Sequence, residues 1–299
     1  MKELILVIAG TMMTIKADQE AGLLLPPLKH LFRGFLKKKH SPNDNEVTIS
    51  LYYEHFVALR KFKAEPIILS TNRDRETTRI INHIARRYPV SGKTLLVGFL
   101  NGVLAYNVHS REARIFLFRS RGKNLLIGSL YKLLFVFTAM LMAQQKKLLV
   151  HGAGLLIKSK GILFIGASGA GKSTVAGYVP TEDVLSDDAT VVEKKGGLFR
   201  IHASPFSQVD IFEEKGADRH LKKATLVKII FLKKAERLAL KPRDRHSALA
   251  ELLSLHIHSF ELMDRELKTS AFNFCGDLCA SIPSFDLHFQ KNDGFLSLF

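Results

Sequence analysis

The sequence predicts an α/β fold, in the wider sense α+β, with a larger C-terminal domain preceded by a smaller mixed one. An apolar run, ILFI, leads directly into GASGAGKST at residues 166–174, which is typical of a strand, a loop and the start of a helix. Short strand-like runs also alternate with segments of helical periodicity along the chain. The 299 residues, 46% of them hydrophobic, are enough for two modest domains.

The first domain is predicted to span residues 1–121 and to mix strands with helices. Its strand-like runs are Leu4–Ala9, Val47–Tyr53, Ile67–Ser70, Thr94–Tyr106 and Ala113–Phe118. The pair Asn101-Gly102 and the stretch 109–112 are typical of turns, so the last of these runs predict a hairpin.

Two helices are expected in the same domain. Residues 24–39 place apolar side chains at helical spacing, and the turn-rich HSPNDNE follows them. The second helix is expected within residues 71–92, with isoleucines at helical spacing, Thr71 or Asn72 as the N-cap, and an end before Pro89.

The second domain, residues 122–299, is predicted to begin after the charged, glycine-containing SRGKN. Its expected elements are a helix over Leu125–Ala143, strands at Lys147–Leu156 and Ile162–Ile165, a helix after the loop, a strand at Asp183–Leu185, strands around 191–203 and at 226–234, a helix over 243–262 and a β-like tail at 281–290. This order indicates an α/β domain.

The charge of the chain favours an anionic partner. The net charge is +16, and residues 1–125 hold 21 Lys and Arg against 10 Asp and Glu, which is +11 of that total. Such a field attracts acidic peptides or proteins, nucleic acid or nucleotide. The alternative is a basic surface that keeps the protein soluble and has no dedicated partner.

Three features bear on the compartment and favour a cytoplasmic protein. Cys275 and Cys279 have neither zinc-knuckle nor redox-pair spacing, so two small buried side chains are expected. The N-terminus has a short apolar stretch without a cleavage site, which favours a first strand over a signal peptide. The run Leu125–Ala143 is nearly long enough to span a bilayer, but Lys132 in its middle favours a buried helix.

The stretch GASGAGKST matches the phosphate-loop pattern G-x-x-x-x-G-K-[ST] over Gly166–Ser173. Its glycines let several backbone N–H groups converge on phosphate oxygens, and the following helix adds its positive N-terminal end. Lys172 is expected to reach the terminal phosphates and Ser173 to ligate Mg²⁺. The predicted ATP-binding residues are Gly166, Ala167, Ser168, Gly169, Ala170, Gly171, Lys172, Ser173 and Thr174.

The loop alone also resembles that of ABC transporter ATPases. An ABC domain should carry a glutamine loop, an LSGGQ-type signature and a run of four apolar residues ending in Asp-Glu, and none follows here. The acidic pair also begins only thirteen positions after Thr174, which is too compact for a transport ATPase. An ABC-type ATPase is therefore disfavoured.

The acidic pair Asp187 and Asp188 follows the strand-like DVLS. One carboxylate could take the proton of an attacking hydroxyl, and the other could complete the surroundings of Mg²⁺. Because neighbours on a strand point to opposite faces, the two would not share one role. The alternative is a hydrated strand end or turn.

His151 lies fifteen positions before Gly166, at the start of HGAGLLIKSKGILFIG. If this segment forms an antiparallel hairpin through KSKG, the start of its first strand lies beside the end of its second. His151 would then stand next to the phosphate loop, where it could hydrogen-bond the γ-phosphate or the acidic pair. A purely structural histidine is the alternative.

The ordered set of His151-Gly152, GILFIG, GASGAGKS and LSDDA resembles the HPr kinase/phosphorylase family. The resemblance covers residues 125–232 well, the rest of the C-terminal domain loosely and residues 1–120 poorly. It implies a phosphoenolpyruvate-carboxykinase-like, P-loop-containing fold for the second domain. It also implies an ATP- and Mg²⁺-dependent kinase that phosphorylates a serine.

The resemblance also implies roles for residues. Asp187 or Asp188 would deprotonate the serine, with Asp187 preferred and Asp188 nearer the metal or substrate. His151 would contact the transferring phosphate. The implied catalytic residues are His151, Lys172, Asp187 and Asp188, and the implied metal ligands are Ser173 and Asp188.

The segment after the acidic pair departs from the family. Its glycine-rich, glutamate-bearing segment is not recognisable, and IHASPFSQVD stands instead, which argues against the reverse reaction and against HPr as substrate. The segment looks more like HPr-kinase-related proteins of peptide-modification clusters, some of which resemble kinases of precursors such as lasso peptides. His202, Ser204 and Arg243 are candidates for such a site, with ordinary structural positions as the alternative.

Two functions from different classes are consistent with these features. The first is a serine kinase for a peptide or protein, with a small-molecule hydroxyl left open as acceptor. The second is an ATP-binding regulatory module that has lost transfer. The loop, the acidic pair and the histidine together favour the kinase. The expected partners are a nucleotide, an acidic phospho-acceptor and a second copy of the chain, and nucleic acid is not expected.

Overall fold

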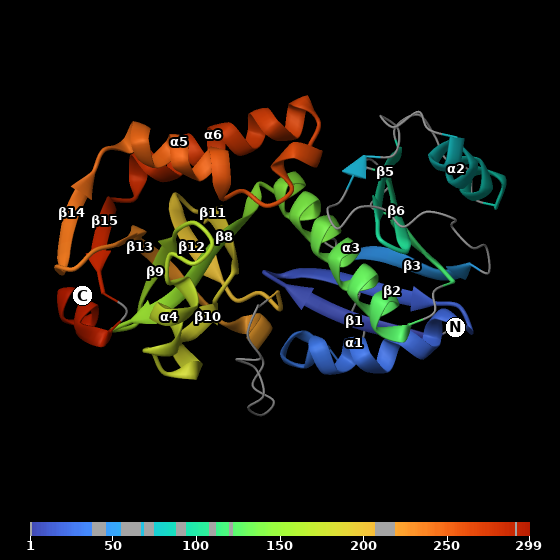
Figure 1. The fold of residues 1–299 in the computed structure, drawn as a ribbon, viewed down its shortest axis with the longest axis horizontal. Coiled ribbons are helices and arrows are strands. Elements are labelled where there is room, and N and C mark those ends of the chain that lie inside the picture. The colour runs from blue at the N-terminus through green and yellow to red at the C-terminus, as the bar shows by residue number, and fades with distance from the viewer. Residues whose placement is uncertain are drawn as a thin grey trace. The chain divides into compact units, whose positions relative to one another are not determined.

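The computed structural model describes residues 2–37, 46–54, 67–68, 75–87, 94–107, 112–119, 122–206, 219–290 and 292–299. The chain divides into two compact units, Met1–Thr138 and Ala139–Phe299, each with its own mixed sheet (Figure 1). The mixed α/β character that the sequence predicts, α+β in the wider sense, is confirmed. The expected boundary near residue 121 lies just before helix α3 (Lys123–Gln144), whereas the division between the units lies inside this helix.

The first unit contains a seven-stranded sheet with the order β1-β2-β3-β7-β6-β5-β4. Its strands are β1 (Lys2–Ile8), β2 (Thr11–Ala17), β3 (Glu46–Glu54), β4 (Ile67–Ile68), β5 (Thr94–Phe99), β6 (Gly102–Asn107) and β7 (Glu112–Phe118). The predicted runs are confirmed where the structure describes them, while residues 69–70 and the expected turn at 109–111 lie outside the described residues. The turn predicted at Asn101-Gly102 lies one residue earlier, at Leu100 and Asn101, because Gly102 pairs with Phe99 as the first residue of β6.

Strand β2 was not predicted. The N-terminal apolar stretch is a hairpin, and its two turn residues, Ala9 and Gly10, have φ values of 48° and 77°. A two-residue turn of this kind needs positive φ at both positions, and an alanine gives no sequence signal for it.

The helix expected over residues 24–39 is broken into short pieces. Helix α1 covers Leu25–Leu31, with 3₁₀ turns at Ala21–Leu24 and Arg33–Phe35. Phe32 leaves the helical region at φ −109° and ψ 17°, and the chain is extended at Leu36. Residues 38–45, with most of HSPNDNE, lie outside the described part.

Helix α2 (Arg75–Arg87) follows the predicted periodicity and buries Ile80 and Ile84. Its proposed N-caps, Thr71 and Asn72, and Pro89 beyond its end lie outside the described residues.

Helix α3 is long and apolar enough to cross a membrane, with a mean hydropathy of 2.0 in its most apolar window. However, 72% of that window is buried inside the protein. In the first unit, for example, the Phe137 ring packs edge-on against Tyr106, with 5.0 Å between centroids. A core helix explains these properties, so α3 gives no evidence of a membrane span.

The second unit contains an eight-stranded sheet with the path β10-β8-β11-β12-β13-β15-β14, while β9 pairs with β13 and β8. Its strands are β8 (Lys147–Ile157), β9 (Lys160–Ile165), β10 (Val184–Ser186), β11 (Ala189–Lys195), β12 (Leu198–His202), β13 (Lys223–Lys234), β14 (Ala239–Arg243) and β15 (Ser284–Phe289). Strand β13 runs parallel to β9 and β15, and the other pairs are antiparallel.

The helices of the second unit differ most from expectation. They are α4 (Lys172–Gly177), α5 (Arg245–Leu255) and α6 (Arg265–Ser281), with 3₁₀ turns at Thr181–Asp183, Arg219–Leu221, Phe260–Leu262 and Asp293–Leu298. The helix predicted over 243–262 ends at Leu255, because His256 has φ −124° and the chain turns towards β8.

Helix α6 was not predicted. Asp264 caps its start, with its side chain accepting from the Leu267 N–H. Its glycine, asparagine and cysteines are poor helix formers, so tertiary packing of its apolar face forms the helix. Cys275 and Cys279 lie on that face as free buried thiols, as expected.

Candidate active site

The β8–β9 hairpin places His151 beside the phosphate loop, as the sequence predicted. Gly152 lies opposite Ile165 in the antiparallel register, so His151 stands level with the first residue of the loop. The strands approach closely here, because a Cβ on Gly152 would lie 2.8 Å from the carbonyl oxygen of Phe164. Only glycine fits this position.

The phosphate loop has the backbone that its glycines allow. Gly169 and Gly171 have φ values of 76° and 116°, which other residues rarely adopt. Gly171 directly precedes α4 and packs under the ring of Phe289, 2.8 Å from where a Cβ would stand. The loop therefore turns tightly from β9 into the N-terminus of α4.

Lys172 folds back onto this loop. Its Nζ donates to the carbonyl oxygens of Gly166 at 2.8 Å and Ala167 at 3.4 Å, and the residue is 8% exposed. Burial lowers the pKa of the Lys172 ammonium, while the charges of Asp188 and Asp187 counteract that shift.

A cavity of about 220 Å³ opens over the loop. Its lining residues are His151, Ser168, Gly169, Gly171, Lys172, Ser173, Thr174 and Asp188. The structure therefore brings the predicted histidine, lysine, serine and one of the two aspartates to a single hollow. Four predicted residues are close in sequence to the lining residues but do not line the cavity themselves: Gly166, Ala167, Ala170 and Asp187.

The two aspartates have different surroundings. Asp187 is only 1% exposed, whereas Asp188 faces the cavity and its Oδ1 lies 3.2 Å from Nε2 of His151. Burial opposes ionisation of Asp188, but the hydrogen bond and charge of His151, with the charges of His258 and Lys172, outweigh it. The pKa of this carboxyl is thus held below its usual value, and Asp188 is a carboxylate at neutral pH.

Two further histidines adjoin His151 and were not predicted. Ile257 bridges to Val150, while the His151 N–H donates to the His256 carbonyl oxygen at 2.7 Å. The rings of His256 and His258 have centroids 5.7 and 5.3 Å from that of His151. The period-2 pattern H-I-H is the signal that could have indicated an extended segment here.

His256 is a buried neutral base in this group. It is 1% exposed, and burial, together with the charge of His151, lowers its pKa to about 4. Its Nε2 lies 4.0 Å from Oε1 of Glu251, beyond hydrogen-bond distance.

Residues 120–297, more than half of the chain, match the sequence model of a family described as SynChlorMet cassette protein ScmC. The chain belongs to this ScmC family. A search of curated proteins gave no match. The matched region contains every residue of the cavity, so the candidate site lies within the part of the chain that defines the ScmC family.

The remaining candidates take structural positions in this ScmC family member. His202 binds Oε2 of Glu193 at 2.9 Å, and the hydroxyl of Ser204 accepts the Phe206 N–H at 3.2 Å. Arg243 binds Glu251 and Asp286 at 2.6 and 2.7 Å. None of the three lines the cavity.

The residues of the cavity are compatible with Mg·ATP. Among the described residues, no group of three or more His, Cys, Asp and Glu side chains could hold a metal ion. Mg²⁺ at a phosphate loop does not need such a group, because it takes one or two protein oxygens together with phosphate oxygens. The Ser173 hydroxyl and the Asp188 carboxylate line one cavity and offer such oxygens.

Proposed function

We propose that this ScmC family member is an ATP- and Mg²⁺-dependent kinase that transfers the γ-phosphoryl group to a serine of a peptide or protein. The observation that best supports this is the pair of His151 and Asp188, 3.2 Å apart on the wall of the phosphate-loop cavity. A carboxylate at this place can accept the proton of an attacking hydroxyl, which phosphoryl transfer needs and nucleotide binding does not. In this proposal residues 122–299 have the phosphoenolpyruvate-carboxykinase-like fold of HPr kinase.

The loop would bind the phosphates through its backbone N–H groups and the N-terminus of α4. Lys172 would leave the carbonyl oxygens of Gly166 and Ala167 and neutralise charge on the terminal phosphates. Ser173 and Asp188 would hold Mg²⁺, which neutralises charge on the β- and γ-phosphates when bound. Positioning and charge neutralisation would thus supply most of the rate.

In this proposal Asp188 is the base as well as a ligand of Mg²⁺, so the two aspartates do not divide these roles as the sequence predicted. The resemblance to HPr kinase implied Asp187 as the base, but Asp188 lines the cavity and Asp187 is buried. With its Oδ1 held by His151, Asp188 keeps its carboxylate directed at the cavity, where it can accept the proton of a serine hydroxyl. Asp187 would act on Lys172 through its charge.

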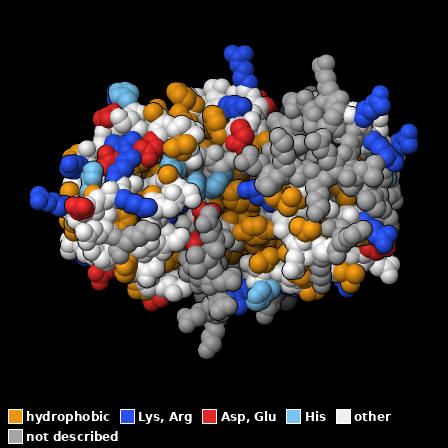
Figure 2. Space-filling model, viewed as in Figure 1, with side chains coloured by type: hydrophobic (Ala, Val, Ile, Leu, Met, Phe, Trp, Pro, Cys, Tyr) orange, Lys and Arg blue, Asp and Glu red, His pale blue; other side chains and the backbone are white. Residues whose placement is uncertain are grey.

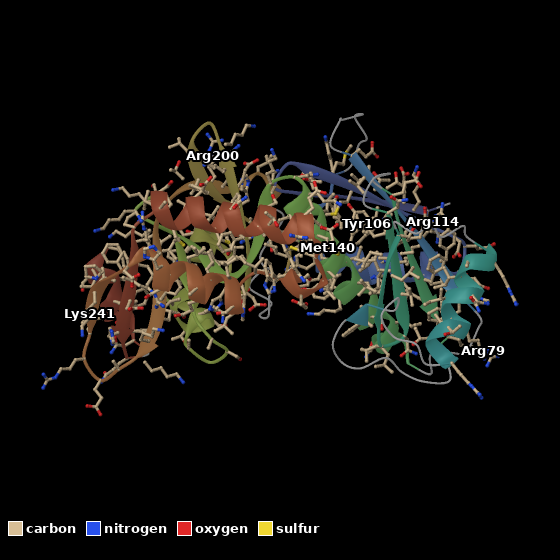
Figure 3. All side chains as sticks on the ribbon, turned by 90° about the horizontal axis from the view of Figure 1, so that it is seen from above. Arg79, Tyr106, Arg114, Met140, Arg200 and Lys241 are labelled. Atoms are coloured by element: carbon tan, nitrogen blue, oxygen red, sulfur yellow. The ribbon has the colours of Figure 1, made fainter. Side chains whose placement is uncertain are left out.

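Helix α2 supports an acidic acceptor. Arg75, Arg79 and Arg86 are exposed and lie along one side of this helix, since residues three, four and seven apart share a face. Figure 3 shows that Arg79 extends away from the strands of its unit. On the face drawn in Figure 2, by contrast, Lys and Arg side chains are scattered. This regular basic stripe fits a peptide or protein segment rich in Asp and Glu.

The test is phosphoryl transfer from labelled ATP. The purified protein is incubated with Mg²⁺, [γ-³²P]ATP and serine-containing acidic peptides, with Lys172→Ala as the inactive control. Labelled phosphoserine is expected with the wild type alone. Tight ATP binding without transfer to any acceptor would replace the kinase with the nucleotide-sensing module, and equal transfer by the Lys172 variant would end the assignment.

A further inference from the structure

One buried hydroxyl holds the turn that carries the two aspartates. Ser186 is fully buried, and its Oγ donates to the carbonyl oxygen of Ala189 at 2.9 Å. The same oxygen accepts the N–H of Ala189 at 3.1 Å and that of Asp188 at 3.4 Å. A single side chain therefore satisfies three backbone groups of the turn, including the N–H of the residue that faces the cavity.

The turn is also fastened to the strand that carries His151. The Gly152 N–H donates to the Asp188 carbonyl oxygen at 2.9 Å, and the Thr190 hydroxyl donates to the Gly152 carbonyl oxygen at 2.8 Å. Ala189 lies opposite His151 in the β8–β11 register. The backbone on both sides of Asp188 is thus fixed, by Ser186 within the turn and by Gly152 across the sheet.

A second buried serine in the same unit offers a comparison. Ser204 is also fully buried and accepts a backbone N–H two residues on, that of Phe206 at 3.2 Å. It lies on neither the cavity wall nor the acidic turn. Both serines are therefore buried and accept a local backbone hydrogen bond. Only the bond of Ser186 is made to a residue of the cavity, Asp188.

We infer that Ser186 is a positioning residue, which directs the Asp188 carboxylate at the phosphate loop and so makes nucleotide binding depend on Mg²⁺. The inference rests on the proposed function, because it assumes that the loop binds Mg·ATP. Without the hydroxyl, the N–H groups of Asp188 and Ala189 lose the acceptor that Ser186 provides, and the turn is less firmly held. The carboxylate would then no longer be held in place for the metal.

The experiment compares the affinity of the full chain for fluorescent mant-ATP with Mg²⁺ and with EDTA. Groups that orient a metal ligand typically change metal affinity or activity by 10–100-fold, so Ser186→Ala should bind Mg·mant-ATP about tenfold more weakly. Its affinity for metal-free mant-ATP should equal that of the wild type. Ser186→Thr, which keeps a hydroxyl, should recover most of the loss, and Ser204→Ala should bind both forms like the wild type.

Four results would overturn the inference. If Ser186→Ala binds both forms like the wild type, Ser186 does not position the site. If Ser186→Ala weakens the binding of Mg·mant-ATP and of metal-free mant-ATP equally, the role of Ser186 is structural. The same conclusion follows if Ser204→Ala changes the two affinities as Ser186→Ala does. If the wild type itself does not bind mant-ATP, the proposed function fails too, so the two failures are distinguishable. Should the alanine variant not fold, Ser186→Cys replaces it, because a thiol keeps the shape but bonds weakly.

Discussion

At the scale of single residues, the two adjacent aspartates in the turn between β10 and β11 have different surroundings. Asp188 faces the cavity beside His151, and Asp187 is buried. We expect Asp188→Asn to reduce phosphoryl transfer by about 10²–10⁴-fold, the usual contribution of a general base. Initial rates with labelled ATP and one fixed acceptor measure this.

Asp187→Asn is the matched control, since it removes the same charge one position away. It should affect the transfer rate less than Asp188→Asn, because its carboxylate does not reach the cavity. A larger loss with Asp187→Asn would return the role of base to Asp187.

The buried His256 ring should make the stability of the protein depend on pH. Burial, aided by the charge of His151, lowers its pKa to about 4, whereas an unfolded histidine titrates near ~6.5. Between these values the unfolded chain binds a proton that the native one does not. The stability due to the neutral ring is thus complete above about pH 6.5 and is lost as the pH falls towards 4.

Urea denaturation at pH 7.5 and 5.0 tests this. His256→Phe should lose about 2 kcal/mol less on acidification than the wild type, as a folded pKa of about 4 implies over this pH range. His246, whose side chain is 80% exposed, provides the control, and His246→Ala should keep the wild-type pH dependence. Identical pH dependence in His256→Phe and the wild type would show that His256 does not contribute.

The sequence predicted some of these residues and not others, for physical reasons. The position of His151 followed from hairpin geometry, because the pairing of two adjacent strands fixes which residues face each other. His256 and His258 were hidden, because helical periodicity was extended through them. The contact that ends α5 there is with Val150, far away in sequence, and no local pattern encodes it.

At the scale of elements, the close approach of β8 and β9 depends on Gly152. A Cβ would lie 2.8 Å from a backbone carbonyl oxygen, which cannot move without shifting β9. Gly152→Ala should therefore destabilise the protein by about 1–3 kcal/mol, as overpacking does. The free energy of unfolding from urea denaturation measures it.

Gly177 provides the control for this substitution, because no atom lies within 4 Å of its Cβ position and it belongs to α4. Gly177→Ala should be neutral or stabilise by up to about 1 kcal/mol through helix propensity. If Gly152→Ala is as stable as the wild type, the two strands can separate to admit a methyl group.

Elements with strong local signals were predicted, and those formed by packing were not. Strands β5 and β6 were predicted from Asn101-Gly102 and the apolar runs beside it. Helix α6 was missed because its weak helix formers gain their order from the core, where Phe274 packs edge-on to Phe199 at 5.5 Å. The same holds for the parallel pairing of β13 with β9 and β15, which joins segments distant in sequence.

At the scale of the whole molecule, two domains were predicted from the sequence, with their boundary near residue 121 at the charged segment SRGKN. The border by contacts lies within α3, after Thr138. Because α3 is mostly apolar on both sides of Thr138, its sequence does not show where one unit ends and the next begins. The region that matches the ScmC family begins at residue 120 and so includes all of α3, although the first part of this helix belongs to the first unit.

The net charge of +16 leads to the last prediction, on the basic stripe of α2. Arg75→Glu/Arg79→Glu/Arg86→Glu should weaken binding of a fluorescent poly-glutamate peptide at least about tenfold at low salt, since each exposed ion pair contributes about 0.2–1 kcal/mol and reversal adds repulsion. The difference should shrink as salt rises, because the Debye length falls to about 3 Å at 1 M. Fluorescence anisotropy at several salt concentrations measures both effects.

The matched control reverses three exposed lysines of the second unit, Lys158, Lys160 and Lys195, and so changes the net charge by the same amount. If the acceptor docks on α2, this variant should bind the peptide nearly as well as the wild type. Equal weakening by the two triple variants would mean that the peptide responds to net charge alone, and α2 would then lose its role as the docking surface for an acidic acceptor.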